Sequence, residues 1–305
     1  MTRAHLDSGI ELEYDTFGSP DDPALLLVMG FTAQMIAWQD GFCEQLAARG
    51  RYVIRFDNRD CGLSSKLDGQ HVDTAAVLGA AMSGAEIPPV PYLLSDMAAD
   101  AIGLLDHLDI DRAHVVGASM GGMIVQTMAI EHPDRLHSVT SIMSTVGDPD
   151  YGAAKPEAMA ILLSPPPSGR DEVIERSGGF KIWASKRYYD EAAAKEFAAI
   201  AYDRSFYPEG ATRQLAAITA SGDRSEALRS VTTPMLVIHG LDDTLIDPSG
   251  GRRTAELVPN AHLLEVADMG HDMPPPLWPL LTSAIVGHQA SAVHPSAGAP
   301  VEVAS

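Results

Sequence analysis

The hydrophobic residues of this chain form two kinds of pattern. Residues 24–29 and 235–239 are apolar runs of strand length, which is typical of strands covered on both faces of a parallel sheet. Residues 10–17 alternate apolar and polar positions, which predicts a half-exposed antiparallel strand at a sheet edge. Strands are predicted at residues 10–17, 24–29, 52–56, 114–118, 136–143, 235–239 and 263–266.

Helical periodicity occupies most of the intervals between these strands. In residues 95–108 the apolar side chains fall on one stripe, and Ser95 and Asp96 supply a helix cap. Helices are predicted at residues 38–48, 95–108, 120–132, 248–257 and 277–286. This alternation of strands and helices predicts an α/β fold around a central, mostly parallel sheet.

The alternation lapses between residues 144 and 233, which carry two alanine-rich helical stretches and most of the aromatic residues. Such rings suit a cap packed over a pocket, although they could equally form the core of that segment itself. We therefore predict a core made of residues 1–143 and 234–288, with residues 144–233 as a cap subdomain. The irregular residues 65–94 are expected to form a surface excursion, and the Ala-, Ser- and Pro-rich residues 289–305 a disordered tail.

Composition narrows the classes of partner and compartment. The 305 residues carry a net charge of −20, which disfavours binding to nucleic acid or to anionic membranes. No apolar run reaches the length that a bilayer needs and the first residues lack a signal-peptide core, so we predict a cytoplasmic protein. Cys43 and Cys61 are too few for a disulfide scaffold and are expected to be buried small hydrophobes.

A candidate nucleophile, Ser119, lies in the segment Gly117-Ala118-Ser119-Met120-Gly121-Gly122, between a predicted strand and a predicted helix. Residues without bulk on either side let the serine adopt a strained backbone at the positive end of the helix. The G-x-S-x-G pattern alone occurs by chance in roughly one chain of this length in ten. Its meaning therefore depends on partners elsewhere in the chain.

A serine hydroxyl needs a base to accept its proton and a third group to orient that base. His271 and Asp243 each follow a later predicted strand, and the order Ser…Asp…His is that of one particular scaffold. Asp242 competes with Asp243 for the acid role, and Asp148 or Asp150 offers a further alternative. The other histidines at element ends or in strands are expected to be structural: His132, His137, His239 and His262.

The turn Met29-Gly30-Phe31-Thr32 ends the second predicted strand, so the backbone N–H of Phe31 is a candidate oxyanion donor. The alternative is a plain turn in which Phe31 only packs. The charged loop 57–64 follows the next strand and is expected to be a hydrogen-bonded turn. No histidine–carboxylate cluster has metal-ligand spacing and no phosphate-binding glycine motif occurs, so we predict neither a metal nor a cofactor.

Over about residues 8–288 the chain resembles the α/β-hydrolase fold superfamily, and within it the serine esterases similar to aclacinomycin methylesterase. The resemblance implies an eight-stranded sheet, a helical cap after the sixth strand, and an oxyanion hole formed by the N–H groups of Met120 and Phe31. It also favours Asp243, three residues after Gly240, over Asp242 as the acid. Many relatives have His-Gly where this chain has Met29-Gly30, which removes a side chain that could brace the loop. The motifs that carry the resemblance are Met29-Gly30-Phe31, Asp57-Asn58-Arg59-Asp60-Cys61-Gly62-Leu63-Ser64, Gly117-Ala118-Ser119-Met120-Gly121-Gly122, Gly240-Leu241-Asp242-Asp243 and Gly270-His271.

The resulting expectation is a serine carboxylesterase that acts on a small to medium, moderately hydrophobic ester through an acyl-enzyme on Ser119. A thioesterase, a cofactor-free perhydrolase or a C–C bond hydrolase could use the same three residues. A non-enzymatic ligand receptor on the same scaffold is a further alternative. The oligomeric state stays open, with a homodimer as one option.

Overall fold

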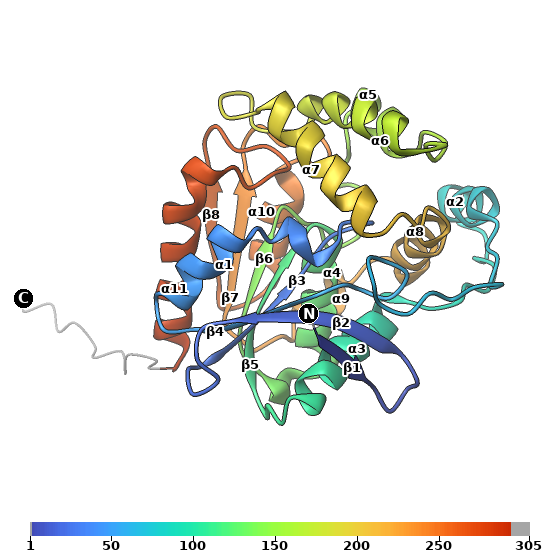
Figure 1. Cartoon of the computed structure of the whole chain (residues 1–305). Coiled ribbons are helices and arrows are strands. Elements are labelled where there is room, and N and C mark those ends of the chain that lie inside the picture. The colour runs from blue at the N-terminus through green and yellow to red at the C-terminus, as the bar shows by residue number, and fades with distance from the viewer. Residues whose placement is uncertain (1, 294–305) are drawn as a thin grey trace, which may run out of the picture.

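A computed structural model describes residues 2–293 and has a mixed eight-stranded sheet at its centre (Figure 1). The strand order is β1-β2-β4-β3-β5-β6-β7-β8. β2 pairs antiparallel with β1 and β4, and the other neighbours are parallel, so the predicted eight-stranded, mostly parallel sheet is confirmed. The strands are β1 (Thr2–His5), β2 (Glu11–Phe17), β3 (Ala24–Val28), β4 (Tyr52–Phe56), β5 (Ala113–Ala118), β6 (Leu136–Ile142), β7 (Met235–Gly240) and β8 (Ala261–Val266).

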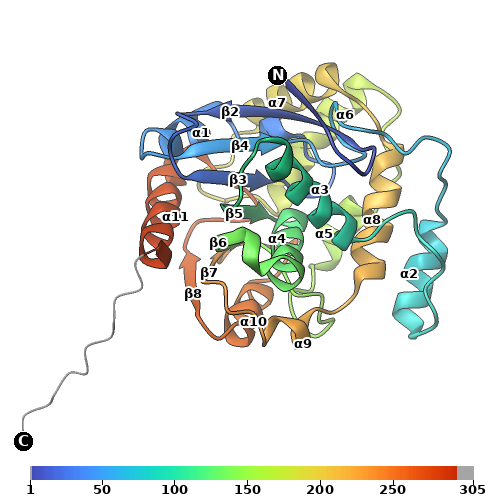
Figure 2. The same cartoon turned by 90° about the horizontal axis from the view of Figure 1, so that it is seen from below.

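Helices cover both faces of the sheet, as the views in Figures 1 and 2 show together. Leu25 and Leu27 of β3 lie in one apolar cluster, whereas Leu26 and Val28 lie in the other. Because successive side chains of a strand point to opposite faces, this double coverage explains the continuous apolar run. One face carries α1 (Asp40–Ala47) and α11 (Trp278–Val293), and the other carries α3 (Leu94–His107), α4 (Met120–Glu131) and α10 (Ser249–Leu257).

A helical insertion connects β6 to β7, which confirms a helical cap after the sixth strand. Helices α5, α6 and α7 form a layer over one end of the sheet, and α8 descends beside the core (Figure 1). The inserted helices are α5 (Pro156–Leu162), α6 (Arg170–Ser177), α7 (Glu191–Arg204), α8 (Glu209–Ser221) and α9 (Ser225–Leu228), with the short 3₁₀ segment η3 (Gly178–Ile182). Further 3₁₀ turns are η1 (Met35–Ala37), η2 (Pro133–Arg135) and η4 (Pro275–Leu277).

Three sequence-based expectations need correction. Residues 10–17 do not form the sheet edge, because β1 pairs along β2 from Thr2 to His5. Residues 65–94 contain the helix α2 (Thr74–Ser83), whose apolar composition has no stripe that would have predicted it. The last helix continues to Val293, so disorder does not begin at residue 289; the remainder of that tail, 294–305, lies outside the described residues.

Gln289 shows why the last helix continues past its predicted end. Its side chain is buried, and its Oε1 accepts a hydrogen bond of 2.6 Å from Arg51 Nε. A polar contact to a residue more than two hundred positions away leaves no trace in local periodicity.

Three glycines let α4 pack directly against the sheet. A Cβ at Gly117 would lie 2.0 Å from the Gly121 carbonyl oxygen, and one at Gly121 would lie 2.1 Å from that of Val28. A Cβ at Gly122 would meet the Ser144 side chain at 2.4 Å. Only glycine fits these close approaches, so the turn between β5 and α4 is set by backbone contact.

Replacing Gly121 by alanine should destabilise the protein by about 3 kcal/mol, because α4 would have to move away from the Val28 carbonyl. Urea unfolding at neutral pH measures the effect. The matched control is Gly79→Ala in α2, where an added Cβ has no atom within 4 Å. The free energy of unfolding of that control should rise by about 0.5–1 kcal/mol. Equal midpoints for the two variants would contradict the packing argument.

Candidate active site

Ser119 occupies the apex between β5 and α4 in a strained conformation. Its φ of 56° and ψ of −120° are rare for a residue other than glycine. The Ser119 N–H donates to the Ile142 carbonyl at 2.9 Å, and Ser144 Oγ donates to the Ser119 carbonyl at 2.8 Å. These bonds hold the backbone, and the side chain is left at the N-terminus of α4, where the helix dipole favours negative charge.

His271 follows β8 and faces the serine. Its Nε2 lies 2.9 Å from Ser119 Oγ. The His271 N–H donates to the carbonyl of Trp183, a residue of the insertion, at 2.6 Å. A Cβ at the preceding Gly270 would lie 2.3 Å from that carbonyl, so glycine is required for the loop and the insertion to come this close.

Asp243 completes a chain of three side chains. Its Oδ2 lies 2.7 Å from His271 Nδ1, and its Oδ1 accepts the N–H groups of Leu245 and Ile246, each at 2.9 Å. The buried His239 places its Nε2 3.4 Å from Asp243 Oδ2. The carboxylate is therefore fixed from several sides with one oxygen directed at the imidazole.

Burial by itself would raise the pKa of the Asp243 carboxyl. Interaction with the His271 imidazolium and hydrogen bonds from His239 and His271 outweigh burial and lower that pKa to about 2. Asp243 is thus a carboxylate at neutral pH. It can hold the Nδ1 proton of His271 and favour the tautomer whose Nε2 accepts a proton.

The competing carboxylates lie elsewhere. Asp242 forms an ion pair of 3.2 Å with Lys186, and Asp148 lies 3.5 Å from Arg253 Nε. Asp150 is exposed. The structure brings Ser119, His271 and Asp243 together and leaves these three acids outside the group.

The two candidate oxyanion donors lie on either side of the serine. Met120 is the first residue of α4, and Phe31 follows Gly30, where an added Cβ would be 3.0 Å from Ser119 Cβ. Within residues 2–293, no acceptor bonds the backbone N–H of Phe31 or of Met120. Both N–H groups therefore have no internal acceptor among the described residues and stay candidate oxyanion donors.

The loop 57–64 supports the turn that carries Phe31. Asn58 Nδ2 donates to the Met29 carbonyl at 2.8 Å, and the Asp57 carboxylate accepts the N–H groups of Met35 at 2.7 Å and Leu63 at 2.8 Å. These contacts hold the loop that carries Met29 and Phe31. The expectation that residues 57–64 form a hydrogen-bonded turn agrees with these contacts.

Gln214 of α8 is the neighbour of this site that sequence reasoning did not identify. Its Oε1 accepts the Thr32 N–H at 2.8 Å, directly beside the candidate donor Phe31. The local sequence is an ordinary amphipathic helix and holds no signal for this contact. No group of three or more His, Cys, Asp or Glu in the described chain could hold a metal ion.

The family of the chain follows from comparison with known proteins. The sequence profile of the alpha/beta hydrolase fold matches residues 23–274. The chain belongs to the α/β hydrolase fold family. The α/β hydrolase described here has, among residues 2–293, no helix that is long and apolar enough to cross a membrane.

Two curated relatives and one solved structure illustrate its neighbours in the family. This α/β hydrolase is 29% identical to rhodomycin D methylesterase DauP of Streptomyces sp. (strain C5), over 95% of this chain and 99% of that protein. It is 26% identical to 3-oxoadipate enol-lactonase 2 of Acinetobacter baylyi, over 86% of each chain. The crystal structure of the enol-lactonase from Burkholderia xenovorans LB400 superposes with a TM-score of 0.72 at 22% identity, covering 95% of this chain and 100% of that one. The predicted resemblance to methylesterases of this fold is confirmed.

The lowered pKa of Asp243 predicts that the folded protein loses stability as the pH falls. A carboxyl whose pKa is about 2 in the folded protein and higher in the unfolded chain stabilises the fold above the unfolded pKa. This stabilisation is lost as the pH falls towards 2.

Between pH 5 and pH 3, wild type should lose about 1 kcal/mol more stability than Asp243→Asn. Urea titrations at both pH values measure the difference. The neighbouring variant Asp242→Asn, which removes only a partly exposed ion pair, should follow wild type; a parallel loss in all three proteins would contradict the prediction.

Proposed function

We propose that this α/β hydrolase is a serine carboxylesterase that forms an acyl-enzyme on Ser119. The observation that carries the proposal is the continuous contact from Ser119 Oγ to His271 Nε2 at 2.9 Å and from His271 Nδ1 to Asp243 Oδ2 at 2.7 Å. A nucleophile, a base and an orienting carboxylate in this order are what acyl transfer requires.

In the first half of the proposed reaction, His271 Nε2 accepts the hydroxyl proton as Ser119 Oγ bonds to the ester carbonyl carbon. Asp243 stabilises the imidazolium that forms. The carbonyl oxygen becomes an oxyanion and accepts hydrogen bonds from the backbone N–H groups of Phe31 and Met120. His271 then returns the proton to the departing alkoxide, and the alcohol leaves.

In the second half, water attacks the acyl-enzyme while His271 accepts a proton from it. A second tetrahedral oxyanion forms in the same place and collapses as the bond between Ser119 Oγ and the acyl carbon breaks. His271 returns its proton to Ser119 Oγ, and the acid leaves. Each oxyanion donor is expected to lower the barrier by about 2.7–4 kcal/mol. The N-terminus of α4 adds a favourable dipole at the same position.

The names of the relatives and the aromatic residues of the insertion support the proposed substrate class. A methylesterase and an enol-lactonase, by their names, each act on an ester bond. Phe180 and Trp183 of the insertion stack with ring centroids 5.1 Å apart, and the Trp183 carbonyl accepts a hydrogen bond from the His271 backbone N–H, so an aromatic pair belongs to the segment that contacts the base. A neutral, moderately hydrophobic carboxylic ester fits these features best.

Ser119→Ala should reduce the hydrolysis of p-nitrophenyl butyrate at least about 10⁴-fold, because the base then has no hydroxyl to activate. Intact-mass spectrometry should detect a butyryl adduct on the wild-type protein and none on the variant. Full activity of Ser119→Ala would refute the serine mechanism. Absence of both ester turnover and fluorophosphonate labelling in the wild type would favour a ligand receptor. Turnover of a thioester would indicate a thioesterase, and cleavage of a diketone a C–C bond hydrolase. Peroxide-dependent turnover of a carboxylic acid would indicate a perhydrolase.

The net charge of −20 predicts discrimination against anionic esters. At low ionic strength, kcat/KM for p-nitrophenyl hemisuccinate should be at least about 10-fold below that for p-nitrophenyl butyrate. Raising NaCl from about 20 mM to about 0.5 M should raise the hemisuccinate value several-fold and leave the butyrate value nearly constant, because salt screens exposed charge. Equal values for the two esters that do not respond to salt would contradict the prediction.

A further inference from the structure

The segment 29–35, here called the oxyanion loop, is bonded to the inserted helices as well as to the core. The Thr32 N–H donates to Gln214 Oε1 at 2.8 Å, and Gln214 Nε2 donates to the Arg59 carbonyl at 3.0 Å. The Gln214 side chain is fully buried. One amide of α8 therefore joins the oxyanion loop to the loop that follows β4.

Thr32 is the strained residue of the oxyanion loop. Its φ of 57° lies in the left-handed region, which is unusual for a β-branched side chain. The Ala33 N–H closes a turn onto the Gly30 carbonyl at 3.3 Å, and Cys61 Sγ donates to the Thr32 carbonyl at 3.3 Å. A conformation of this kind persists only where its surroundings hold it. The Gln214 and Cys61 bonds hold Thr32 on both sides.

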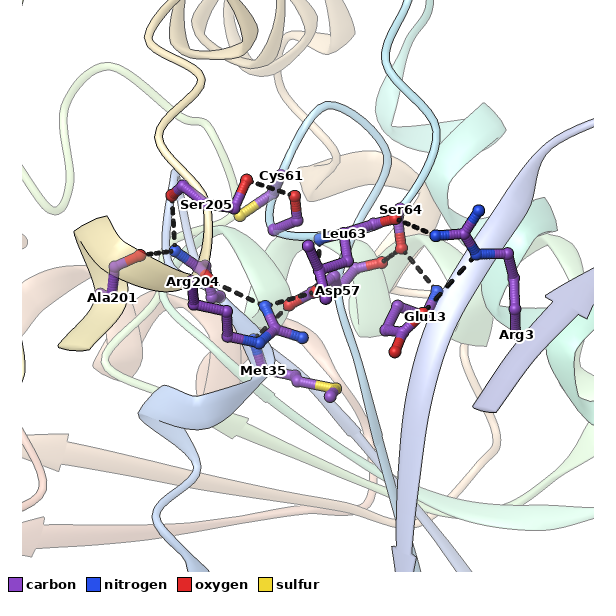
Figure 3. Close-up of polar contacts among 12 residues, drawn as sticks. Arg3, Glu13, Met35, Asp57, Cys61, Leu63, Ser64, Ala201, Arg204 and Ser205 are labelled. Atoms are coloured by element: carbon purple, nitrogen blue, oxygen red, sulfur yellow. Dashed lines mark hydrogen bonds and ion pairs between the residues drawn. The ribbon is translucent and has the colours of Figure 1, made fainter. Parts of the chain in front are cut away.

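The far end of the oxyanion loop is fixed separately, as Figure 3 shows around Asp57 and Arg204. Arg204, at the end of α7, places Nη1 2.8 Å from Asp57 Oδ2 and donates to Gln34 Oε1 at 2.6 Å. Gln34 Nε2 in turn donates to the carbonyls of Ala201 at 2.6 Å and Ser205 at 2.9 Å. Asn58 holds the near end of the oxyanion loop through the Met29 carbonyl. With both ends anchored, the orientation of the turn 30–33 depends on the contacts of Thr32.

We propose that Gln214 is a positioning residue for the oxyanion donor Phe31, so that the insertion is a fixed part of the catalytic structure. Phe31 lies between Gly30, where an added Cβ would be 3.0 Å from Ser119 Cβ, and Thr32, whose N–H donates to Gln214. Without the Gln214 bond, the strained turn relaxes and the Phe31 N–H moves away from the developing oxyanion. The inference rests on the proposed esterase function.

The expected effect lies in kcat. An oxyanion donor acts on charge that develops in the transition state, so moving it changes kcat while substrate binding is kept. A displacement of about 1 Å at a reacting centre can cost about 100-fold in rate. A residue that only stabilised the fold would change the unfolding temperature and the amount of active protein, without this kinetic signature.

The test is Gln214→Met, which keeps the length of the side chain and removes both hydrogen bonds. Its kcat for p-nitrophenyl butyrate should fall about 10- to 100-fold with KM changed less than about twofold. The inhibition constant of a trifluoromethyl ketone, which forms an oxyanion on the serine, should rise by the same factor. Gln214→Glu keeps an acceptor for the Thr32 N–H and should recover kcat to within about fivefold of wild type.

The matched control is Tyr207→Phe in the same insertion. Tyr207 Oη donates to Asp68 at 2.7 Å and accepts from Arg213 at 2.7 Å, and it bonds no residue of the oxyanion loop. This control should lower the unfolding temperature and leave kcat and the inhibition constant unchanged. If Gln214→Met does not fold, Gln214→Asn, which is one methylene too short to reach Thr32, takes its place with the same expected outcome.

Wild-type kcat in a folded Gln214→Met protein, or an equal loss of kcat in Tyr207→Phe, would overturn the positioning role while leaving the esterase proposal intact. Retained activity in Ser119→Ala would instead overturn the esterase proposal. The two failures are therefore distinguished by different variants.

Discussion

Close backbone contact between Gly117 and Gly121 is the constraint on which the rest of the site depends. Because no side chain separates β5 from the first turn of α4, the chain must reverse within one residue, and Ser119 takes up the strain. In this conformation its hydroxyl oxygen lies 2.9 Å from His271 Nε2. The same close packing places the Met120 N–H at the beginning of α4, beside the proposed nucleophile.

Buried ion pairs dock the insertion onto the core. Asp57 with Arg204 and Asp60 with Arg213 each join a loop after β4 to an inserted helix, at 2.8 Å in both cases. Removing one partner of such a pair leaves an uncompensated buried charge, which is strongly destabilising. The charged loop after β4 thus contacts the insertion, whereas the residues of the proposed chemistry follow β5, β7 and β8.

Local pattern predicted the elements that bury apolar surface and missed those held by distant contacts. The strand at 52–56 was predicted with its observed bounds, and β3 and β7 differed by one residue at an end, because continuous apolar runs leave little ambiguity. β1 has four residues and depends on pairing with β2. The last turns of α11 depend on the bond between Arg51 and Gln289.

The sequence by itself determined the fold class, the strand–turn–helix around Ser119, and the order of Ser119, Asp243 and His271, because each is written in local periodicity and in the ends of parallel strands. The resemblance favoured Asp243 as the acid, and the tertiary structure shows the contact itself, since Asp242 and Asp243 are adjacent in sequence and point to different partners. It also decided that Gln214, on a helix 182 positions after Thr32, holds the turn beside Phe31. Contacts between distant segments depend on how whole elements pack, and no local pattern of residues encodes that.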